Sequence, residues 1–277
     1  MPEVKAVAVQ DEFAAFKTNQ KEAWAGFGVN EGFTTVPAGE LVAFAKIKAG
    51  ERVLDVGCGT GVVAVTAARA GAHVTGLDLT PVLLERAREN VSIAEVEAEF
   101  IEGDAEHLPF ADGSFDVVLS QLGHMFAPRP DVALAEMLRV LKPGGRIAFT
   151  TWPPEHVTGQ LFIMMASHMP PSPEGSPKPA PPVLWGDPNV IRQRLGDGVS
   201  DVRFSRGAMI APALSAKHVQ MGVEMSFGPL KSMLAKLDGA APERASAIRG
   251  QIVELIRENM EGNVLRQHFL MTVASKR

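Results

Sequence analysis

A glycine-rich segment from Val53 to Gly61, with the sequence VLDVGCGTG, constrains the possible folds of this chain more than any other feature. The apolar run 52–56 before the glycines predicts a strand, and the stretch 62–70 after them predicts a helix. Glycine lets the backbone turn sharply and approach a bound molecule closely. A helix that starts at such a turn also offers unpaired N–H groups. The segment therefore predicts a strand, a tight turn and a helix arranged around a small ligand.

The same alternation of strand and helix continues along the chain. Short apolar runs predict further strands, and one of the helices between them has Thr80 at a capping position and Pro81 at its first position. The expected strands are 73–77, 99–102, 116–120 and 146–151, and the expected helices are 81–90 and 131–141. Strands that alternate with helices predict an α/β fold with a parallel sheet covered on both faces.

The segments on either side of this regular region are expected to be mostly helical. One short helix is expected within 11–30 and another at 37–48, and residues 163–168 also look helical. The proline-rich stretch 170–188 predicts an extended loop that leads into a short helix ending at Leu195. Strands are expected at 201–210 and 265–275, with helices 214–236 and 242–260 between them. One sheet with helical insertions explains this pattern better than two independent domains.

Composition excludes several classes of protein. The chain has 277 residues, a formal net charge of −5 and one cysteine. One cysteine excludes a disulfide framework and a cysteine-ligated zinc site, and it fits a reducing, cytoplasmic compartment. The mildly acidic balance argues against nucleic acid as the main partner. Because no apolar run approaches the ~18 residues of a membrane span, no integral membrane contact is expected.

The acidic residue Asp78, 17 residues after Gly61, narrows the choice of ligand. An acid about 20 residues beyond the glycines can accept hydrogen bonds from both hydroxyls of a ribose, and Leu79 would lie against the flat face of a base. Asp78 could instead cap the next helix, although Thr80 suits that role better. The third glycine comes one residue too early for a nicotinamide fingerprint, and the GK[ST] of a phosphate loop is missing.

Five segments in this order resemble the class I S-adenosylmethionine-dependent methyltransferases, particularly the branch similar to the ubiquinone and menaquinone C-methyltransferases. The resemblance covers about residues 45–152. It implies a Rossmann-like methyltransferase sheet of seven strands, the last one antiparallel, with helical cap insertions. The segments are ERVLDVGCGTG, VTGLDL, EGDAEHLPF, FDVVLS and LKPGGRI.

The resemblance implies that S-adenosylmethionine binds at the C-terminal ends of the first four strands, where ligands bind in open parallel sheets. Amides of the glycine turn would hold its carboxylate, Asp55 would orient its ammonium group and Asp78 would bind the ribose. Asp104 would contact the adenine amino group, and the backbone of Ala105 a ring nitrogen. No metal is expected. The residues assigned to the cofactor are Trp24, Asp55, Gly57, Cys58, Gly59, Gly61, Asp78, Leu79, Asp104, Ala105, Ser120 and Gln121.

His124 is the candidate catalytic residue, because it follows the fourth strand in the segment SQLGHMF. A histidine at that place could take a proton from a hydroxyl, an amine or an activated carbon acid. The sequence contains no tyrosine that could do so instead. The alternative is a histidine that packs without taking part in chemistry. Two cofactor assignments have similar alternatives: Cys58 can be a small turn residue, and Trp24 with Phe27 can be a packed helix face instead of a lid.

The expected organisation is an N-terminal helical lid (1–45), a cofactor-binding core (46–152), cap segments (153–199 and 212–263) and two core strands (200–211 and 264–277). The apolar character of the cap segments predicts a small, hydrophobic methyl acceptor, methylated on oxygen, nitrogen or carbon. Two other functions stay open at this point. One is a protein that binds S-adenosylmethionine or S-adenosylhomocysteine without transferring a methyl group. The other, less consistent with the glycine spacing, is a nicotinamide-dependent oxidoreductase.

Overall fold

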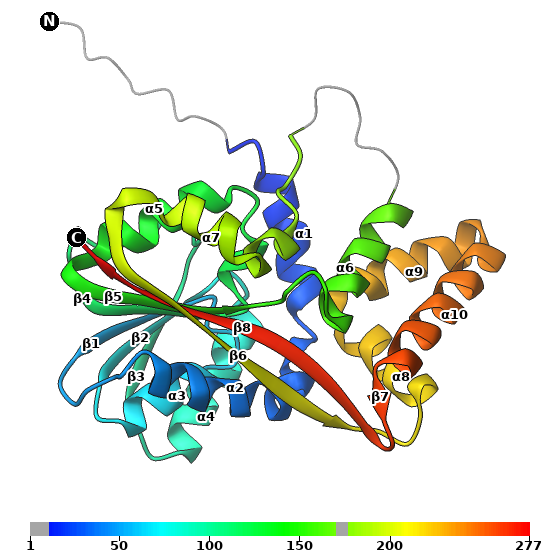
Figure 1. Cartoon of the computed structure of the whole chain (residues 1–277), viewed down its shortest axis with the longest axis horizontal. Coiled ribbons are helices and arrows are strands. Elements are labelled where there is room, and N and C mark those ends of the chain that lie inside the picture. Colours follow the sequence, from blue (N-terminus) through cyan, green and yellow to red (C-terminus); the bar gives the residue numbers. More distant parts are fainter. Residues whose placement is uncertain (1–10, 170–176) are drawn as a thin grey trace, which may run out of the picture.

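The predicted strands join in one mixed sheet in the computed structural model, which describes residues 11–169 and 177–277 (Figure 1). Its strands are β1 Arg52–Val56, β2 His73–Asp78, β3 Ala98–Glu102, β4 Phe115–Gln121, β5 Leu141–Thr151, β6 Val199–Pro212, β7 Met260–Glu261 and β8 Val264–Lys276. They lie in the order β3-β2-β1-β4-β5-β8-β6, with β1 to β5 parallel and β8 antiparallel to both neighbours. The predicted Rossmann-like sheet with an antiparallel last strand is confirmed, and β7 adds a two-residue partner of β8.

Helices cover both faces of this sheet. They are α1 Ala14–Trp24, α2 Glu31–Phe44, α3 Val62–Arg69, α4 Pro81–Ile93, α5 Pro130–Val140, α6 Val157–His168, α7 Pro188–Leu195, α8 Ala216–Ser226, α9 Gly228–Ala240 and α10 Pro242–Glu258. Short 3-10 helices add η1 Phe27–Asn30, η2 His124–Phe126, η3 Pro182–Gly186 and η4 Gly196–Gly198. In Figure 1, α2, α3 and α4 lie on one face, and α5 and α7 on the other.

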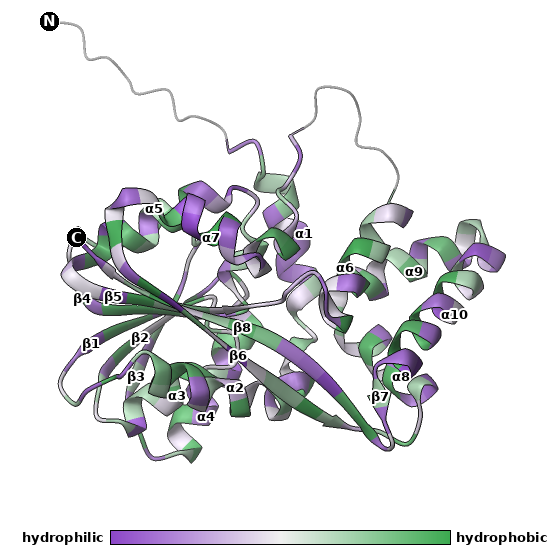
Figure 2. Ribbon diagram, viewed as in Figure 1, coloured by the Kyte–Doolittle hydropathy of each residue, from purple (hydrophilic) through white to green (hydrophobic). Residues whose placement is uncertain are grey.

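Both faces are buried because the central strands are apolar on both sides. On β1, Leu54 joins an apolar cluster with residues of α5 and α7, whereas its neighbour Val53 joins a second cluster with α2 and α3. Figure 2 shows the same hydrophobic strands in the middle of the sheet. Burying each such side chain fully contributes roughly 1.5–3 kcal/mol to the free energy of folding, so these two clusters hold the layers together. The frame that carries the loops at the ends of the strands is therefore rigid.

The last two long strands extend past the rest of the sheet. β5 ends where Thr151 pairs with Leu270, but β6 and β8 continue as a two-stranded ribbon until Pro212 pairs with Val264. The far end of this ribbon carries α6, α8, α9 and α10, which we call the helical cap (Figure 1). A third apolar cluster, centred on residues such as Leu230 and Ile252, holds the cap together.

The helix expected over 214–236 is two helices, because the chain turns sharply at Phe227. Phe227 has an extended backbone (φ −96°, ψ 94°), and Pro229 lies in the first turn of α9, where its missing N–H costs nothing. Gly228 at this break packs directly on α1: a Cβ atom at this position would lie 1.6 Å from the carbonyl oxygen of Ala23. The break therefore lets the cap contact the N-terminal helix.

The N-terminal segment divides into two parts with different surroundings. The helix expected within 11–30 is α1 with η1, and the helix expected at 37–48 begins earlier, at Glu31, with Pro37 inside it. Proline is typical of a first helical turn, so Pro37 led to the prediction that the helix starts there. α2 packs on the sheet beside α3, so within the described residues 11–45 it is α1 and η1 that lie over the strand ends.

Two parts of the sequence predictions lie outside the described residues: residues 1–10 of the N-terminal lid and residues 170–176 of the proline-rich loop. Among the helices of the described ranges, none combines the length and the apolar character needed to cross a lipid bilayer.

Candidate functional site

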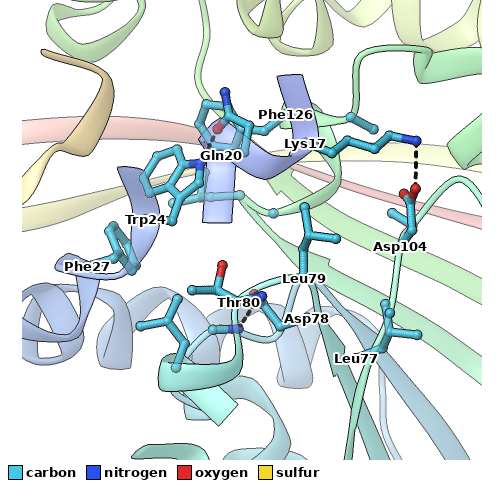
Figure 3. A pocket seen from close by; sticks show the side chains of 18 of the residues that line it. Lys17, Gln20, Trp24, Phe27, Leu77, Asp78, Leu79, Thr80, Asp104 and Phe126 are labelled. Carbon is cyan, nitrogen blue, oxygen red and sulfur yellow. Dashed lines mark hydrogen bonds and ion pairs between the residues drawn. The ribbon is translucent and has the colours of Figure 1, made fainter. Parts of the chain in front are cut away.

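A cavity of about 150 Å³, here called the strand-end cavity, lies at the C-terminal ends of β1, β2 and β4, beside α1 (Figure 3). Most of the residues that the sequence assigns to a cofactor meet there. Those that line the cavity are Trp24, Gly57, Gly59, Asp78, Leu79, Asp104, Ala105 and Gln121. Asp55, Cys58, Gly61 and Ser120 belong to the same strand ends and turns but are not part of the lining. The structure therefore brings the predicted cluster together around one space.

The glycine turn has the conformation for which glycine is required. Gly57, Gly59 and Gly61 all have positive φ angles, of 68°, 53° and 79°. A Cβ atom on Gly57 would also lie 2.8 Å from the Cα atom of Gly123, so two backbone segments touch at this point. Any side chain at Gly57 would push the loop after β4 away from the cavity.

Asp78 connects this turn to the next helix. Its Oδ2 atom accepts a hydrogen bond from the Gly59 N–H, and its Oδ1 atom accepts one from the Thr80 N–H, each 2.8 Å long. Thr80 is the N-cap residue of α4, but its side chain makes no capping hydrogen bond. Burial raises the pKa of Asp78, although both N–H groups favour the charged form. Asp78 therefore holds the glycine turn and the start of α4 together at the cavity. The expectation that the Thr80 side chain caps α4 is wrong.

Asp55 is fully buried behind the glycine turn. Neither of its carboxylate oxygens has a hydrogen-bond partner among the described residues. Burial and the nearby charge of Asp78 raise the pKa of Asp55 to about 8. Buried polar atoms are normally satisfied by a partner, so this carboxylate is suited to a donor or cationic group of a ligand or to bound water.

A cluster of charged groups, here called the Lys17 cluster, ties α1 to the loops at the strand ends. The ammonium nitrogen of Lys17 lies 2.7 Å from an oxygen of Asp11 and 2.6 Å from oxygens of both Asp104 and Glu106. Burial opposes the charge of Lys17, but the three carboxylates outweigh it and raise its pKa above the usual range. The guanidinium of Arg129 adds a second cation, 2.7 Å from Glu106.

Lys17 was not among the predicted residues, although α1 carries a signal that points to it. Phe13, Lys17, Gln20 and Trp24 are spaced by three or four residues and so share one face of the helix. The last three line the strand-end cavity. Figure 3 shows Lys17 reaching Asp104 and the indole N–H of Trp24 donating to Gln20, a bond of 2.6 Å. Lys17 and Gln20 share a helix face with the aromatic residues Phe13 and Trp24, and polar residues in such a place indicate a functional contact.

A second and larger cavity of about 600 Å³, here called the cap cavity, lies between the cap, α2 and η1. Its lining is mostly apolar. It shares four residues with the strand-end cavity, and these four, here called the shared wall, are Trp24, Phe27, Leu122 and Phe126. The ring of Trp24 packs 5.5 Å from Phe27 and 4.7 Å from Phe126, measured between ring centroids. The two spaces therefore meet at an apolar wall.

His124 does not line either cavity. Its side chain is 1% exposed and packs between Phe149 and Trp185, with ring centroids 4.6 Å from each. Neither ring nitrogen has a partner among the described residues. Burial and the nearby charge of Arg194 lower the pKa of His124 to about 3, so the imidazole is neutral at ordinary pH. Its role as a general base stays a prediction, since in this conformation the imidazole packs in the core.

Of the remaining predicted residues, Ser120 and Gln121 form hydrogen bonds with the backbone, and Cys58 is buried in the glycine turn. The hydroxyl of Ser120 donates to the Val56 carbonyl (2.6 Å) and accepts from the His124 N–H (3.0 Å), which joins β4 to β1. The amide of Gln121 donates to the Thr34 carbonyl of α2 (2.8 Å). Cys58 is buried, and burial raises the pKa of its thiol, which does not favour redox chemistry.

Comparison with known proteins adds independent evidence. A family model described as a methyltransferase domain matches residues 54–149. The chain is 37% identical over 237 residues to the uncharacterized protein Rv1403c of Mycobacterium tuberculosis, which is 85% of each chain. It is 44% identical over 99 residues to a demethylmenaquinone methyltransferase of Clavibacter sepedonicus, covering 36% of this chain and 40% of that protein.

The fold is also found among solved structures. The YcgJ protein from Bacillus subtilis superimposes with a TM-score of 0.56 at 19% identity, covering 87% of this chain and 97% of that one. The matched methyltransferase domain, residues 54–149, runs from β1 into β5 and so contains the glycine turn, Asp78 and Asp104. Sequence match, strand order and the placement of these residues agree, and the chain belongs to the class I S-adenosylmethionine-dependent methyltransferases.

Proposed function

We propose that this enzyme transfers a methyl group from S-adenosylmethionine, bound in the strand-end cavity, to a small, largely apolar molecule in the cap cavity. The observation that carries the proposal is the shared wall. A cavity at the strand ends and a separate apolar cavity under the cap meet at Trp24, Phe27, Leu122 and Phe126. Two molecules placed in these spaces would meet at that wall, which is the arrangement that a transfer reaction requires.

The residues of the strand-end cavity suit the chemical groups of the cofactor. We assign the cofactor's ammonium group to the neighbourhood of Asp55, whose buried carboxylate has no partner among the described residues; because Asp55 lies behind the glycine turn and outside the lining, it would act through a bound water or after a shift of the turn. Asp78 would hold the ribose: a carboxylate has about four lone-pair sites, and two backbone N–H groups use only part of them. Asp104, Ala105 and Leu79 would surround the adenine.

When bound, S-adenosylmethionine supplies a methyl group on a sulfonium cation, which becomes a neutral thioether once the methyl group has passed to the acceptor. The protein contributes alignment and exclusion of water. The apolar side chains of the shared wall suit both tasks. His124 remains the predicted base, and the turn 122–124 would have to rearrange for its imidazole to reach an acceptor.

The test is a transfer assay with S-adenosylmethionine and a panel of small phenols, amines and quinols, followed by detection of S-adenosylhomocysteine. We expect product with apolar acceptors and none with charged ones, because the cap cavity is mostly apolar. In parallel, calorimetry measures the binding of S-adenosylmethionine and of NAD to the protein. Cofactor binding without transfer to any acceptor would favour a non-catalytic binding protein, and binding of NAD alone would refute the cofactor assignment.

A further inference from the structure

The floor of the cap cavity is a ribbon of two strands with one polar side chain on it. Met209 and Ala211 of β6 and Leu265 and Gln267 of β8 all line the cavity. They are cross-strand partners, Met209 with Gln267 and Ala211 with Leu265, so they share one face of the ribbon. Three of the four are apolar. Gln267 therefore places a primary amide on an otherwise hydrophobic floor.

The side chain of Gln267 has no hydrogen-bond partner among the described residues, which is also true of Asn30, Thr158 and Ser226 in the lining; Gln267 differs from these three in lying on the strand ribbon of the floor. The hydroxyl of Thr34 donates to backbone carbonyls of its own helix, and the imidazole of His218 is paired with the hydroxyl of Ser215. No hydrogen bond joins the Gln267 side chain to another group in the described part of the chain. Its amide offers two donors and one acceptor, and ladder pairing on β8 holds its backbone in place.

The strand register gives the separation between this amide and the shared wall. Gln121, next to Leu122 of the wall, pairs with Thr150, and Thr150 pairs with Met271. Gln267 lies four residues further along β8, on the order of 13 Å at about 3.3 Å per residue, and two strands across from Gln121, on the order of 10 Å at about 4.8 Å per strand, which together separate the two backbone positions by about 16 Å. The side chains of Leu122 and Gln267 both line the cap cavity and occupy part of this distance. A molecule that touches both the wall and the amide is therefore elongated, about the size of two joined aromatic rings.

We infer that Gln267 is a specificity-determining residue: it binds a hydroxyl or carbonyl group at the end of the acceptor remote from the methylated atom. The acceptor class is then an elongated, uncharged, apolar molecule with one polar group at its far end. This inference rests on the proposed function, since it takes the cap cavity as the acceptor site. It goes further by naming the shape of the acceptor and the group that the protein recognises.

The test compares two probes by calorimetry on the full chain saturated with S-adenosylhomocysteine. One probe is biphenyl with a para hydroxyl on one ring, and the other carries a para hydroxyl on both rings. We expect the second to bind the unmodified protein roughly 3- to 10-fold more tightly, as one additional neutral hydrogen bond provides. Gln267→Leu should abolish this preference, because leucine has nearly the same volume but no hydrogen-bonding group. Gln267→Glu should retain a preference, because its carboxylate accepts a bond from the hydroxyl.

The matched control is Gln160→Leu, which removes an exposed amide on the outer side of α6 and should leave the preference unchanged. Equal affinities of the two probes for the unmodified protein would overturn the inference. So would a preference that survives in Gln267→Leu, or S-adenosylhomocysteine binding with no binding of either probe. Failure of the proposed function has a different signature: S-adenosylhomocysteine itself would not bind, or the transfer assay would give no product with any acceptor while the two probes still differ in affinity.

Discussion

At the scale of single residues, the carboxylate of Asp78 has the widest influence on the strand-end cavity. It accepts one hydrogen bond from the glycine turn and another from the start of α4, so it sets the distance between these two elements. The same carboxylate faces the cavity and is available to a ligand. A substitution here acts on the shape of the cavity and on its chemistry together.

Asp78→Ala is expected to weaken S-adenosylmethionine binding by roughly 1–3 kcal/mol, because hydrogen bonds from the ribose hydroxyls to a carboxylate are lost. Calorimetry measures the change. Glu97→Ala serves as the control. Glu97 is an exposed acid directly before β3, at the end of the strand away from the cavity, so this variant should bind S-adenosylmethionine normally. Unchanged affinity of a folded Asp78→Ala protein would refute the ribose assignment.

Asp55 should make the stability of the ligand-free protein depend on pH. Its pKa rises from 3.8 to about 8 on folding, so the folded protein holds this proton more tightly than the unfolded chain does. The stabilisation from the proton is present below about pH 4 and is lost as the pH rises to about 8. Urea unfolding at several pH values should therefore show Asp55→Asn gaining stability relative to the unmodified protein across this window. Parallel curves for the two proteins would contradict the raised pKa.

His124→Phe separates chemistry from packing at the candidate base. Phenylalanine keeps a ring between Phe149 and Trp185 but removes both ring nitrogens. If His124 is the base, turnover falls while the affinity for S-adenosylmethionine stays nearly unchanged. Steady-state kinetics and calorimetry measure the two quantities. Equal turnover would assign His124 to packing alone.

At the scale of secondary-structure elements, α1 is attached to the sheet by the Lys17 cluster at one end and by the aromatic packing of Trp24 at the other. The ammonium of Lys17 has three carboxylates within 2.7 Å, from the segment before α1 and from the loop after β3. Removing this cation leaves three acids close together, one of which, Glu106, is almost fully buried. At this end, the position of α1 over the strand-end cavity therefore depends mainly on the Lys17 ammonium, with Arg129 as a second cation.

Lys17→Met is expected to cost roughly 3 kcal/mol of stability, because it removes the central partner of three carboxylates and leaves Arg129 as the cation beside the buried Glu106. It should also speed the release of bound S-adenosylmethionine, since α1 lies beside that cavity. Lys21→Met is the control on the same helix. Lys21 pairs with Glu102 at the surface, so its removal should cost less than about 1 kcal/mol. Chemical unfolding and stopped-flow release measure both effects, and equal losses for the two variants would contradict the role of the cluster.

The elements could be predicted from the sequence where the signal is local. The strand β1, the glycine turn and the helix α3 follow from neighbouring residues, and the structure has them where they are expected. The break between α8 and α9 was not predicted, although the local pair Gly228–Pro229 is typical of a turn. The packing of Gly228 on Ala23, more than 200 residues away in sequence, could not be predicted from neighbouring residues. For Lys17, the shared helix face is a local signal, but its partners Asp104 and Glu106 come from a distant loop and could not be predicted.

At the scale of the whole molecule, the two cavities depend on how the cap sits against α1. Gly228 of α9 touches the backbone of Ala23, and the next residue, Trp24, belongs to the shared wall. The ring of Trp24 also packs 5.4 Å from that of Phe227, again between centroids. The strand-end cavity could be predicted from motifs because short segments supply it. The cap cavity could not, because its lining comes from α2, α6, α8, α10 and the ribbon.

Gly228→Ala is expected to destabilise the protein by roughly 1–3 kcal/mol, because the new methyl group would lie 1.6 Å from the Ala23 carbonyl oxygen and the helices must move apart. Gly239→Ala, in the same helix, is the control. A Cβ atom there meets nothing within 4 Å, so alanine should stabilise α9 by about 0.5–1 kcal/mol. Thermal unfolding distinguishes the two, and similar melting temperatures would contradict the packing role of Gly228.

The pairing of β6 has a consequence for the order in which the chain can fold during synthesis. Its ladder partners in the sheet all lie on β8, which is made more than 50 residues later, and β8 is also the strand that joins β6 to β5. While the ribosome is still translating α8 to α10, β6 is an open edge without its neighbour. The region around the methyltransferase motifs can assemble first, and the cap cavity is complete only when residues 264–276 have emerged.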